Sequence, residues 1–241
     1  APQVDHLVPE QRVADFLAVT AARAGLDIEF QKALPGRINL IARLQPQGRI
    51  AKTILLAPHM DTVPGHEEQF VPRKEGDRLF GRGACDTKGS VAAMLSAMIT
   101  LANSKQRPRE TEIIFAGLVD EESAQAGSRA LAKSHLKADL AIVGEPTSNQ
   151  IVTAHKGNIW LQLETHGKSA HGSRPELGRN AVHEMARIVD ALETEYAAML
   201  RKRRRHPLLG QGTVNVGTIR GGTQPNIVPD SCVITVDRRT M

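Results

Sequence analysis

Three short, predominantly apolar runs separated by helical stretches constrain the fold of this chain more than any other feature of its sequence. The runs are TILLA (53–57), EIIFAGLV (112–119) and DLAIVG (139–144). Between them lie the helical patterns KGSVAAMLSAMITLANS (88–104) and SAQAGSRALAKSHL (123–136). Apolar strands alternating with helices are typical of a parallel sheet covered by helices on both faces. We therefore predict an α/β domain with a mostly parallel sheet.

The segment before these runs predicts an amphipathic helix and a further strand. EQRVADFLAVTAARAG (10–25) has apolar residues at helical spacing and ends in a glycine, which commonly follows a helix. RINLIARL (37–44) is typical of a strand. The expected buried face of the helix consists of Val13, Phe16, Leu17, Ala21 and Ala24.

A change of pattern near residue 150 predicts a second domain. NIWLQLETHG (158–167) alternates apolar and polar residues, as in a sheet with one exposed side. A helix is predicted at about 179–204, followed by two more strands. This β-α-β-β order predicts a smaller α+β domain over 151–241, after a first domain over 1–150. We expect the second domain to be incomplete at its C-terminus, because the sequence ends directly after a strand.

The composition, with 41% hydrophobic and 24% charged residues, is that of an ordinary globular protein. The net charge of +5 comes largely from RKRRRH (201–206), a kind of run that can bind nucleic acid. We expect no nucleic-acid partner, because the run ends a predicted helix and aromatic residues make up 3% of the chain. No apolar run approaches the roughly 18 residues of a membrane span. The two cysteines form no framework, so a cytoplasmic location is expected.

Acidic residues and one histidine stand where the predicted strands end. PHMD follows the first apolar run, DEE the second and EP the third, and another acid lies in the glycine-rich FGRGACDTKGS before a helix. Ligands of open α/β sheets bind beyond the carboxyl ends of the strands, so these side chains are expected to meet in one crevice. The candidate site consists of His59, Asp61, Asp86, Glu121, Glu122 and Glu145.

The charges of these groups indicate a metal ion. Several carboxylates close together cannot all ionise unless a cation compensates their charge. Imidazole with carboxylates suits Zn²⁺, Co²⁺ or Mn²⁺, whereas Ca²⁺ and Mg²⁺ usually take oxygen ligands alone. A carboxylate between two ions could bridge them in a two-metal hydrolytic site. Of Glu121 and Glu122, we expect only one to face the metal easily, which leaves the other as a general base.

Each motif taken alone has a structural explanation that the residues leave open. His59-x-Asp61 is more often a strand end followed by a turn. Asp-Glu-Glu before a helix is ordinarily N-terminal capping. GRGACDTKG lacks the GxxxxGK[ST] spacing of a phosphate-binding loop. The joint placement of the motifs at strand ends favours the metal site.

Six segments in the same order together resemble the M20 family of metallopeptidases and amidohydrolases. This group includes acetylornithine deacetylase, succinyl-diaminopimelate desuccinylase, aminoacylase and glutamate carboxypeptidase. The resemblance covers nearly the whole chain from about residue 50. The segments are PHMDTVP, LFGRGACDTKGS, VDEESAQAGS, VGEPTS, HKGNIWLQLETHGKSAHGSRPELGRNAV and GGTQPNIVPD.

The resemblance implies a role for each residue of the candidate site. His59 and Glu145 would bind one metal ion, Glu122 a second, and Asp86 would bridge the two ions. Two zinc ions would occupy a complete site. Glu121 would be the general base that activates a metal-bound water, and Asp61 would be a catalytic residue that orients the metal-binding imidazole. The implied fold of the first domain is zinc-peptidase-like.

For the second domain, the resemblance implies a ferredoxin-like fold that mediates homodimerisation. His171 in GKSAHGS would reach the active site of the partner subunit and stabilise the oxyanion. Asn226 in QPNIVPD would contact the substrate. Arg239 in VDRRT is a candidate anchor for a substrate carboxylate, with Arg238 as the competing residue.

The implied function is metal-dependent hydrolysis of an amide bond in a small N-acyl amino acid or dipeptide. A non-catalytic protein of the same fold, acting in binding or regulation, is the alternative. The resemblance also indicates an N-terminal portion, because family members continue past the position of Met241 and supply a further histidine ligand there. The 241-residue chain alone is therefore expected to hold one metal ion or none and to have low activity.

Overall fold

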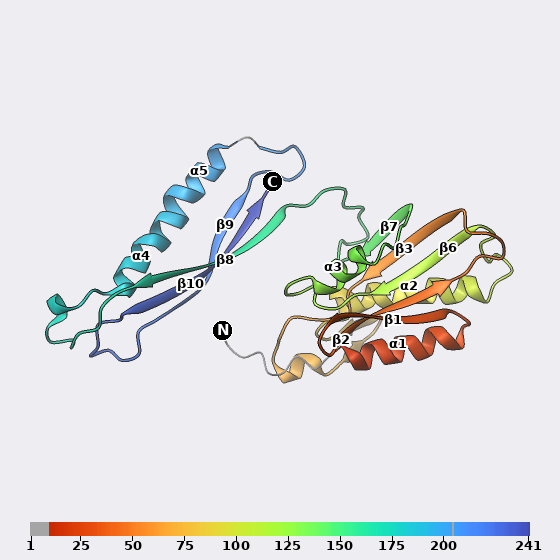
Figure 1. The fold of residues 1–241 in the computed structure, drawn as a ribbon, viewed down its shortest axis with the longest axis horizontal. Coiled ribbons are helices and arrows are strands. Elements are labelled where there is room, and N and C mark those ends of the chain that lie inside the picture. The colour runs from red at the N-terminus through yellow and green to blue at the C-terminus, as the bar shows by residue number, and fades with distance from the viewer. Residues whose placement is uncertain (1–9, 204) are drawn as a thin grey trace. The chain divides into compact units, whose positions relative to one another are not determined.

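The computed structural model describes residues 10–203 and 205–241, and the chain divides into two compact units at residue 150. Unit 1 comprises residues 1–150 and unit 2 comprises residues 151–241. Figure 1 shows unit 1 in red to green and unit 2 in green to blue. Each unit has its own sheet and its own hydrophobic core, so each is described by itself.

The main sheet of unit 1 has five strands in the order β1-β2-β6-β3-β7 (Figure 1). β6 pairs in parallel with β3, and β3 in parallel with β7, whereas β2 is antiparallel to both of its neighbours. Four strands therefore run in one direction and β2 opposes them, which confirms the predicted mostly parallel sheet. The strands are β1 (Asp27–Leu34), β2 (Arg37–Leu44), β3 (Lys52–Pro58), β6 (Thr111–Gly117) and β7 (Leu140–Gly144).

Helices cover both faces of this sheet, as the apolar runs predict. Alternate side chains of β2 and β6 enter two separate cores: Leu40 and Phe115 pack with α1 and α2, whereas Ile41 and Ile114 pack with Leu131 of α3. This alternation follows from the period of two along a strand. The helices are α1 (Gln11–Arg23), α2 (Gly89–Ala102) and α3 (Ala126–Lys133).

The buried face of α1 differs from the predicted face at Phe16, and it includes Ala14 and Ala18, which were not predicted. Phe16 is 70% exposed, and the helix packs instead through Ala14, Leu17, Ala18 and Ala21. These four positions follow the i, i+3, i+4, i+7 pattern around small residues, which let the helix lie close to β1 and β2.

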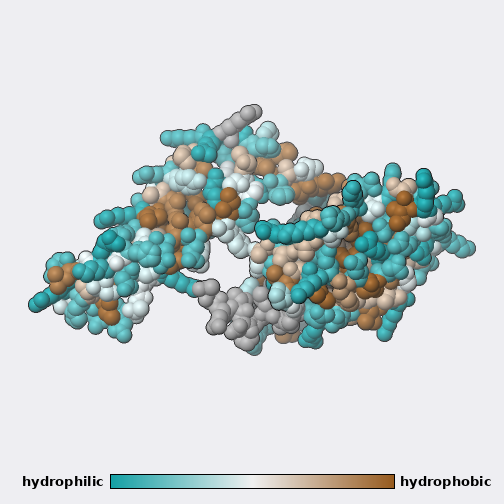
Figure 2. All heavy atoms as spheres, in the orientation of Figure 1, coloured by the Kyte–Doolittle hydropathy of each residue, from teal (hydrophilic) through white to brown (hydrophobic). Residues whose placement is uncertain are grey.

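The edge strand β7 also departs from the sequence-based expectation. Its run is wholly apolar, yet Leu140, Ile142 and Val143 are 53%, 45% and 65% exposed. β7 pairs only with β3 among the described strands, so its outer edge is free. Figure 2 shows apolar atoms, in brown, at the surface of this unit.

The register of the parallel strands aligns their carboxyl ends. Pro58 at the end of β3 pairs with Gly144 at the end of β7, and His59 forms a bridge with Leu118 just after β6. The segments that follow these strands therefore begin at the same edge of the sheet. Between β3 and α2, the chain also forms the hairpin β4 (Arg73–Glu75) and β5 (Arg78–Phe80), and single helical turns at Glu67–Phe70 and Ala84–Lys88.

Unit 2 is an antiparallel sheet in the order β8-β10-β9 with a helix packed on one face (Figure 1). Ala181 and Met185 of α4 pack against Cys232, Ile234 and Val236 of β10. The predicted β-α-β-β order is confirmed. The elements are β8 (Gly157–His166), α4 (Ala181–Ala191), α5 (Ala197–Lys202), β9 (Thr213–Gly221) and β10 (Ser231–Thr240), with helical turns at Pro175–Leu177 and Leu192–Tyr196.

The helical segment of unit 2 ends at Lys202, and Arg204, where the predicted helix would end, lies outside the described residues. The mixed α/β fold class with a smaller α+β unit is confirmed. Within residues 10–203 and 205–241, no helix is long and apolar enough to span a membrane.

Candidate metal centre

His59 lies at the centre of the candidate site, directly after β3. Its side chain is 2% exposed, and its bridge with Leu118 fixes the main chain on the end of β6. Nε2 lies 2.9 Å from Oδ1 of Asp86, and Nδ1 lies 3.4 Å from Oδ1 of Asp61. The two nitrogens of the imidazole are therefore directed toward different carboxylates, one on each side of the ring.

Asp61 links the histidine to the turn that follows β6. Its Oδ1 accepts a hydrogen bond from the amide of Glu121 at 3.1 Å, and its Oδ2 accepts one from the amide of Glu122 at 3.0 Å. Burial opposes ionisation of Asp61, but hydrogen bonds from His59 and the two amides hold the pKa of its carboxyl below the ordinary value. Asp61 is therefore a buried carboxylate that orients both the imidazole and the acidic turn.

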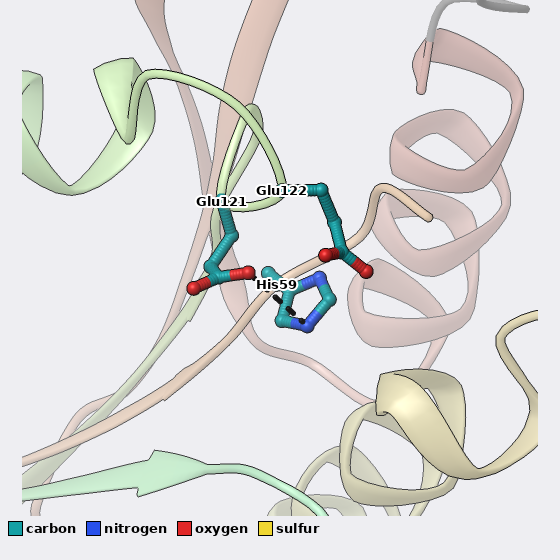
Figure 3. A group of neighbouring side chains, drawn as sticks. All are labelled: His59, Glu121 and Glu122. Carbon is teal, nitrogen blue, oxygen red and sulfur yellow. Dashed lines mark ion pairs between the residues drawn. The ribbon is translucent and has the colours of Figure 1, made fainter. Parts of the chain in front are cut away.

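Glu121 and Glu122 both approach His59 from the turn after β6 (Figure 3). One oxygen of each carboxylate and one imidazole nitrogen lie within 4.8 Å of one another, and Glu121 Oε2 is 3.9 Å from Nε2 of His59. Both carboxylates therefore face the imidazole, and which of the two faces a metal ion stays a prediction. The residues stand on a tight turn, where neighbouring side chains do not alternate as they do along a strand.

Asp86 and Glu145 complete a second group around the same imidazole. One ligand atom each from His59, Asp86 and Glu145 lies within 4.8 Å of the others, and Glu145 Oε2 is 3.9 Å from Nε2. The neighbour of Asp86, Thr87, donates a hydrogen bond from Oγ1 to the carbonyl of Gly144 at 2.8 Å. This bond ties the loop that carries Asp86 to the end of β7.

A glycine lets the Asp86 loop approach the His59 segment closely. Gly83 has φ of +77°, in the left-handed region, and a Cβ on it would lie 2.4 Å from Thr62 Cγ2. Only glycine fits this position without moving the loop. A larger side chain at this position would displace the backbone that carries Asp86.

The electrostatics of the site show an excess of negative charge around one imidazole. Burial by itself lowers the pKa of His59, but hydrogen bonds to Asp61 and Asp86 and the charges of Asp61 and Glu145 raise it to about 9. Burial raises the pKa of Glu121, of Glu122 and of Glu145, and neighbouring carboxylates raise each further, although the charge of His59 lowers it.

These pKa shifts show that the single imidazole does not neutralise the negative charge of the surrounding carboxylates. A divalent cation would neutralise them and displace protons from the same atoms. The donor set of one imidazole and several carboxylates fits Zn²⁺, Co²⁺ or Mn²⁺.

The remaining candidate residues lie in unit 2. Nδ1 of His171 lies 2.8 Å from Oγ of Ser173, and the amide of the next residue, Gly172, donates to the carbonyl of Asn226 at 2.7 Å. The loops that carry His171 and Asn226 are therefore adjacent. Nε of Arg239 pairs with Asp237 at 2.9 Å.

The competing arginine, Arg238, is held within unit 2. Its Nε donates to the hydroxyl of Tyr196 at 3.1 Å, and its guanidinium lies 5.8 Å from the centre of the Tyr196 ring. Alternation along β10 directs Arg238 and Arg239 to opposite faces of the sheet.

The sequence reasoning missed a buried ion-pair network beneath the acidic turn. Arg37 at the start of β2 pairs with Glu10 before α1 and with Asp120 after β6. Glu10 and Asp120 are 7% and 3% exposed. Sequence spacing does not reveal this network, because its members are brought together only by strand pairing and by the packing of α1.

Comparison with known proteins identifies unit 2 first. Residues 153–241 match the M20 peptidase dimerisation domain. Curated relatives match almost the whole chain: a peptidase M20 domain-containing protein of Schizosaccharomyces pombe is 36% identical over 91% of the chain, and an acetylornithine deacetylase of Myxococcus xanthus is 32% identical over 96%. The chain spans 53% and 62% of the length of these two proteins.

Solved structures share the fold at lower sequence identity. An M20 metallo-carboxypeptidase of Sulfolobus solfataricus has a TM-score of 0.74 at 21% identity, covering 96% of this chain and 66% of that one. A tripeptidase of Staphylococcus aureus has a TM-score of 0.68 at 23% identity, covering 95% of this chain and 61% of that one.

Proposed function

We propose that this chain belongs to the M20 family and supplies the metal-binding and dimerisation units of a metal-dependent hydrolase. The proposed reaction is cleavage of an amide bond in a small N-acyl amino acid or peptide. The observation that carries the proposal is the buried imidazole of His59, with the carboxylates of Asp86, Glu121 and Glu145 around its Nε2.

The relatives support this substrate class. Several curated relatives, 31–32% identical to the chain, are named acetylornithine deacetylases, which supports an N-acyl amino acid. The relative from Schizosaccharomyces pombe is named for its peptidase domain, which keeps a small peptide within the proposal.

The proposed metal ligands are the carboxylates and the imidazole at the strand ends. We assign His59, Asp86 and Glu145 to one zinc ion, whose three donor atoms already lie within 4.8 Å of one another. Asp86 and Glu122 would hold a second ion, so that Asp86 would serve both ions. Zinc in such a site polarises an amide carbonyl and lowers the pKa of a water molecule, and Co²⁺ or Mn²⁺ can substitute for it.

Glu121 is the proposed general base. Burial and the charges of Asp61 and Asp86 raise the pKa of its carboxyl, which suits a group that must take up a proton and release it again. Glu121 would take a proton from the attacking water and pass it to the leaving nitrogen. Asp61 would hold the imidazole of His59 and the amide of Glu121 in place during both transfers.

Unit 2 is proposed to mediate a homodimer and to contribute substrate contacts. The match to a dimerisation domain supports the dimer. Within the dimer, His171 would stabilise the oxyanion in the active site of the partner subunit. Asn226 would contact the substrate, and Arg239 would anchor its carboxylate. The adjacency of the His171 and Asn226 loops supports a shared role.

The decisive test replaces the proposed base in the full-length protein that carries this chain. We expect Glu121→Gln to lower kcat by at least about 10²-fold with N-acetyl amino acids or dipeptides, because general-base catalysis contributes on this order. Glu68→Gln, at an exposed glutamate of the same unit, is the matched control and should keep its activity. Activity of Glu121→Gln within a few fold of the unmodified protein would contradict the proposal.

A further inference from the structure

The turn that carries Glu121 and Glu122 is held from below by a second carboxylate besides Asp61. Asp120 has φ of +66°, in the left-handed region, and its side chain is directed back under its own turn. Its Oδ2 accepts hydrogen bonds from the amides of Ala124 at 3.2 Å and Ala126 at 3.1 Å. The Asp120 carbonyl accepts a third bond, from the amide of Gln125 at 2.7 Å.

Asp120 is itself held by Arg37. Nη1 of Arg37 lies 2.5 Å from Oδ1 of Asp120, and the Nε edge of the guanidinium forms a fork with the carboxylate of Glu10, with Nε 3.0 and 3.1 Å from its oxygens. A third acid, Asp61, has its Oδ2 3.9 Å from Nη2. One guanidinium at the start of β2 therefore faces three buried carboxylates, those of Glu10, Asp61 and Asp120.

Two carboxylates, those of Asp61 and Asp120, hold the backbone of the turn that carries Glu121 and Glu122. Asp61 binds the amides of both glutamates, and Asp120 binds two amides farther along the same turn. Without Arg37, Asp61, Asp120 and Glu10 would repel one another, and each would lie in a poorly hydrated position. The turn would then relax away from His59.

We propose that Arg37, acting through Asp120, is a positioning residue that fixes the acidic turn against His59. It touches neither substrate nor metal. Its guanidinium sets the direction of the Glu121 and Glu122 side chains by fixing their backbone. The consequence for catalysis rests on the proposed function, whereas the rigidity of the turn does not.

Arg37→Gln tests this inference, and Arg43→Gln is a closely matched control. Arg43 lies on the same strand and also pairs with a buried glutamate, Glu112 at 3.3 Å, but away from the acidic turn. In the metal-free chain, we expect amide hydrogen exchange over residues 121–126 to be at least tenfold faster in Arg37→Gln. Arg43→Gln should leave this segment within about twofold of the unmodified chain.

Metal binding provides the second readout. We expect Arg37→Gln to bind Co²⁺ at least tenfold more weakly and with an altered visible spectrum, whereas Arg43→Gln keeps both the affinity and the spectrum. In the full-length protein, kcat should fall while KM stays within about twofold, since the turn carries the base. Arg37→Lys, which keeps the charge but loses the fork, should restore part of each effect.

The outcomes separate this inference from the proposed function. If the amide hydrogen exchange over residues 121–126 and the Co²⁺ affinity of Arg37→Gln equal those of Arg43→Gln, the positioning role is overturned. If the unmodified chain binds no Co²⁺, hydrogen exchange alone decides the role of Arg37. If the full-length protein binds no Co²⁺ either, the proposed function fails. If Arg37→Gln does not fold, Arg37→Lys and Asp120→Asn provide the same comparison, because Asp120→Asn tolerates positive φ and retains one acceptor oxygen.

Discussion

At the scale of single residues, the candidate site is organised by the two nitrogens of one imidazole. Nε2 of His59 faces the carboxylates assigned to metal binding, and Nδ1 faces Asp61, which also holds the acidic turn. A carboxylate behind a metal-binding histidine fixes its tautomer and ring orientation. A change at either residue should therefore affect metal affinity before it affects the fold.

The raised pKa of His59 predicts a pH-dependent stability in the metal-free chain. The folded value of about 9 lies above the unfolded value of 6.5, so the stabilisation is fully present below about pH 6.5 and is lost as the pH rises toward 9. The free energy of unfolding of unit 1 should fall by about 3 kcal/mol over this window. Urea denaturation in the presence of a chelator measures it.

His59→Gln is the control for this pH dependence. It removes the titrating imidazole and should show a much smaller fall between pH 6.5 and 9. Saturating zinc should also suppress the fall in the unmodified chain, because the metal then holds the imidazole neutral. An equal slope in His59→Gln would show that other groups cause the pH dependence.

Asp61→Asn should weaken metal binding without abolishing it. Asparagine keeps a similar shape but loses the charge that orients His59, and loss of such a partner typically costs about 10–100-fold in affinity. Calorimetric titration with zinc measures the effect, and Asp77→Asn on the exposed hairpin loop is the control. The unmodified chain is the reference, and we expect its tightest ion at His59, Asp86 and Glu145.

At the scale of elements, each unit depends on its own packed layer. In unit 2, Met185 of α4 is fully buried against β10, where Cys232 and Ile234 are also fully buried. In unit 1, the helices α1, α2 and α3 cover the sheet that positions the site. Because the two cores share no residue, damage to one should leave the other folded.

Met185→Ala should therefore destabilise unit 2 selectively. Truncating a fully buried methionine costs about 2–4 kcal/mol through lost burial and the cavity that remains. We expect unit 2 to unfold at a lower denaturant concentration, and peptide-resolved hydrogen exchange measures this change. The zinc affinity of unit 1 should stay unchanged. Met199→Ala, at a 39% exposed position in α5, is the matched control. Equal destabilisation of both units would refute the independence of the cores.

At the scale of the whole molecule, the proposed assembly is a homodimer through unit 2. Its sheet has free outer edges at β8 and β9 among the described strands. Ile159 on β8 and Ile219 on β9 are 46% and 53% exposed, and apolar atoms (brown) reach the surface of this unit in Figure 2. Unpaired edges with apolar side chains are suited to pairing with a second chain.

The dimer can be tested by charging each edge separately. We expect the unmodified chain to sediment at twice its monomer mass. We expect one of the two variants, Ile219→Lys or Ile159→Lys, to be monomeric, because a lysine on the pairing edge opposes strand addition. The variant at the other edge should stay dimeric. A monomeric unmodified chain, or dimers in both variants, would contradict an interface at a sheet edge.

The sequence by itself determined the helices, the order of the motifs and most of the strands, but β1, β4 and β5 were not predicted. Apolar runs with a period of two or 3.6 residues are local, so they predicted the α/β unit, the β-α-β-β unit and the acids after the strands. The roles of His171, Asn226 and Arg239 stay predictions. Phe16 was placed on the wrong side of α1, because periodicity alone does not reveal which stripe the sheet covers.

Only the tertiary structure decided how the site is supported. The order of the strands brought Arg37 of β2 beneath a turn that follows β6, 83 residues later in the chain, and the packing of α1 brought Glu10 to the same guanidinium. The backbone of that turn directed both Glu121 and Glu122 toward His59. Such contacts between distant segments depend on register and packing, which no local pattern of residues encodes.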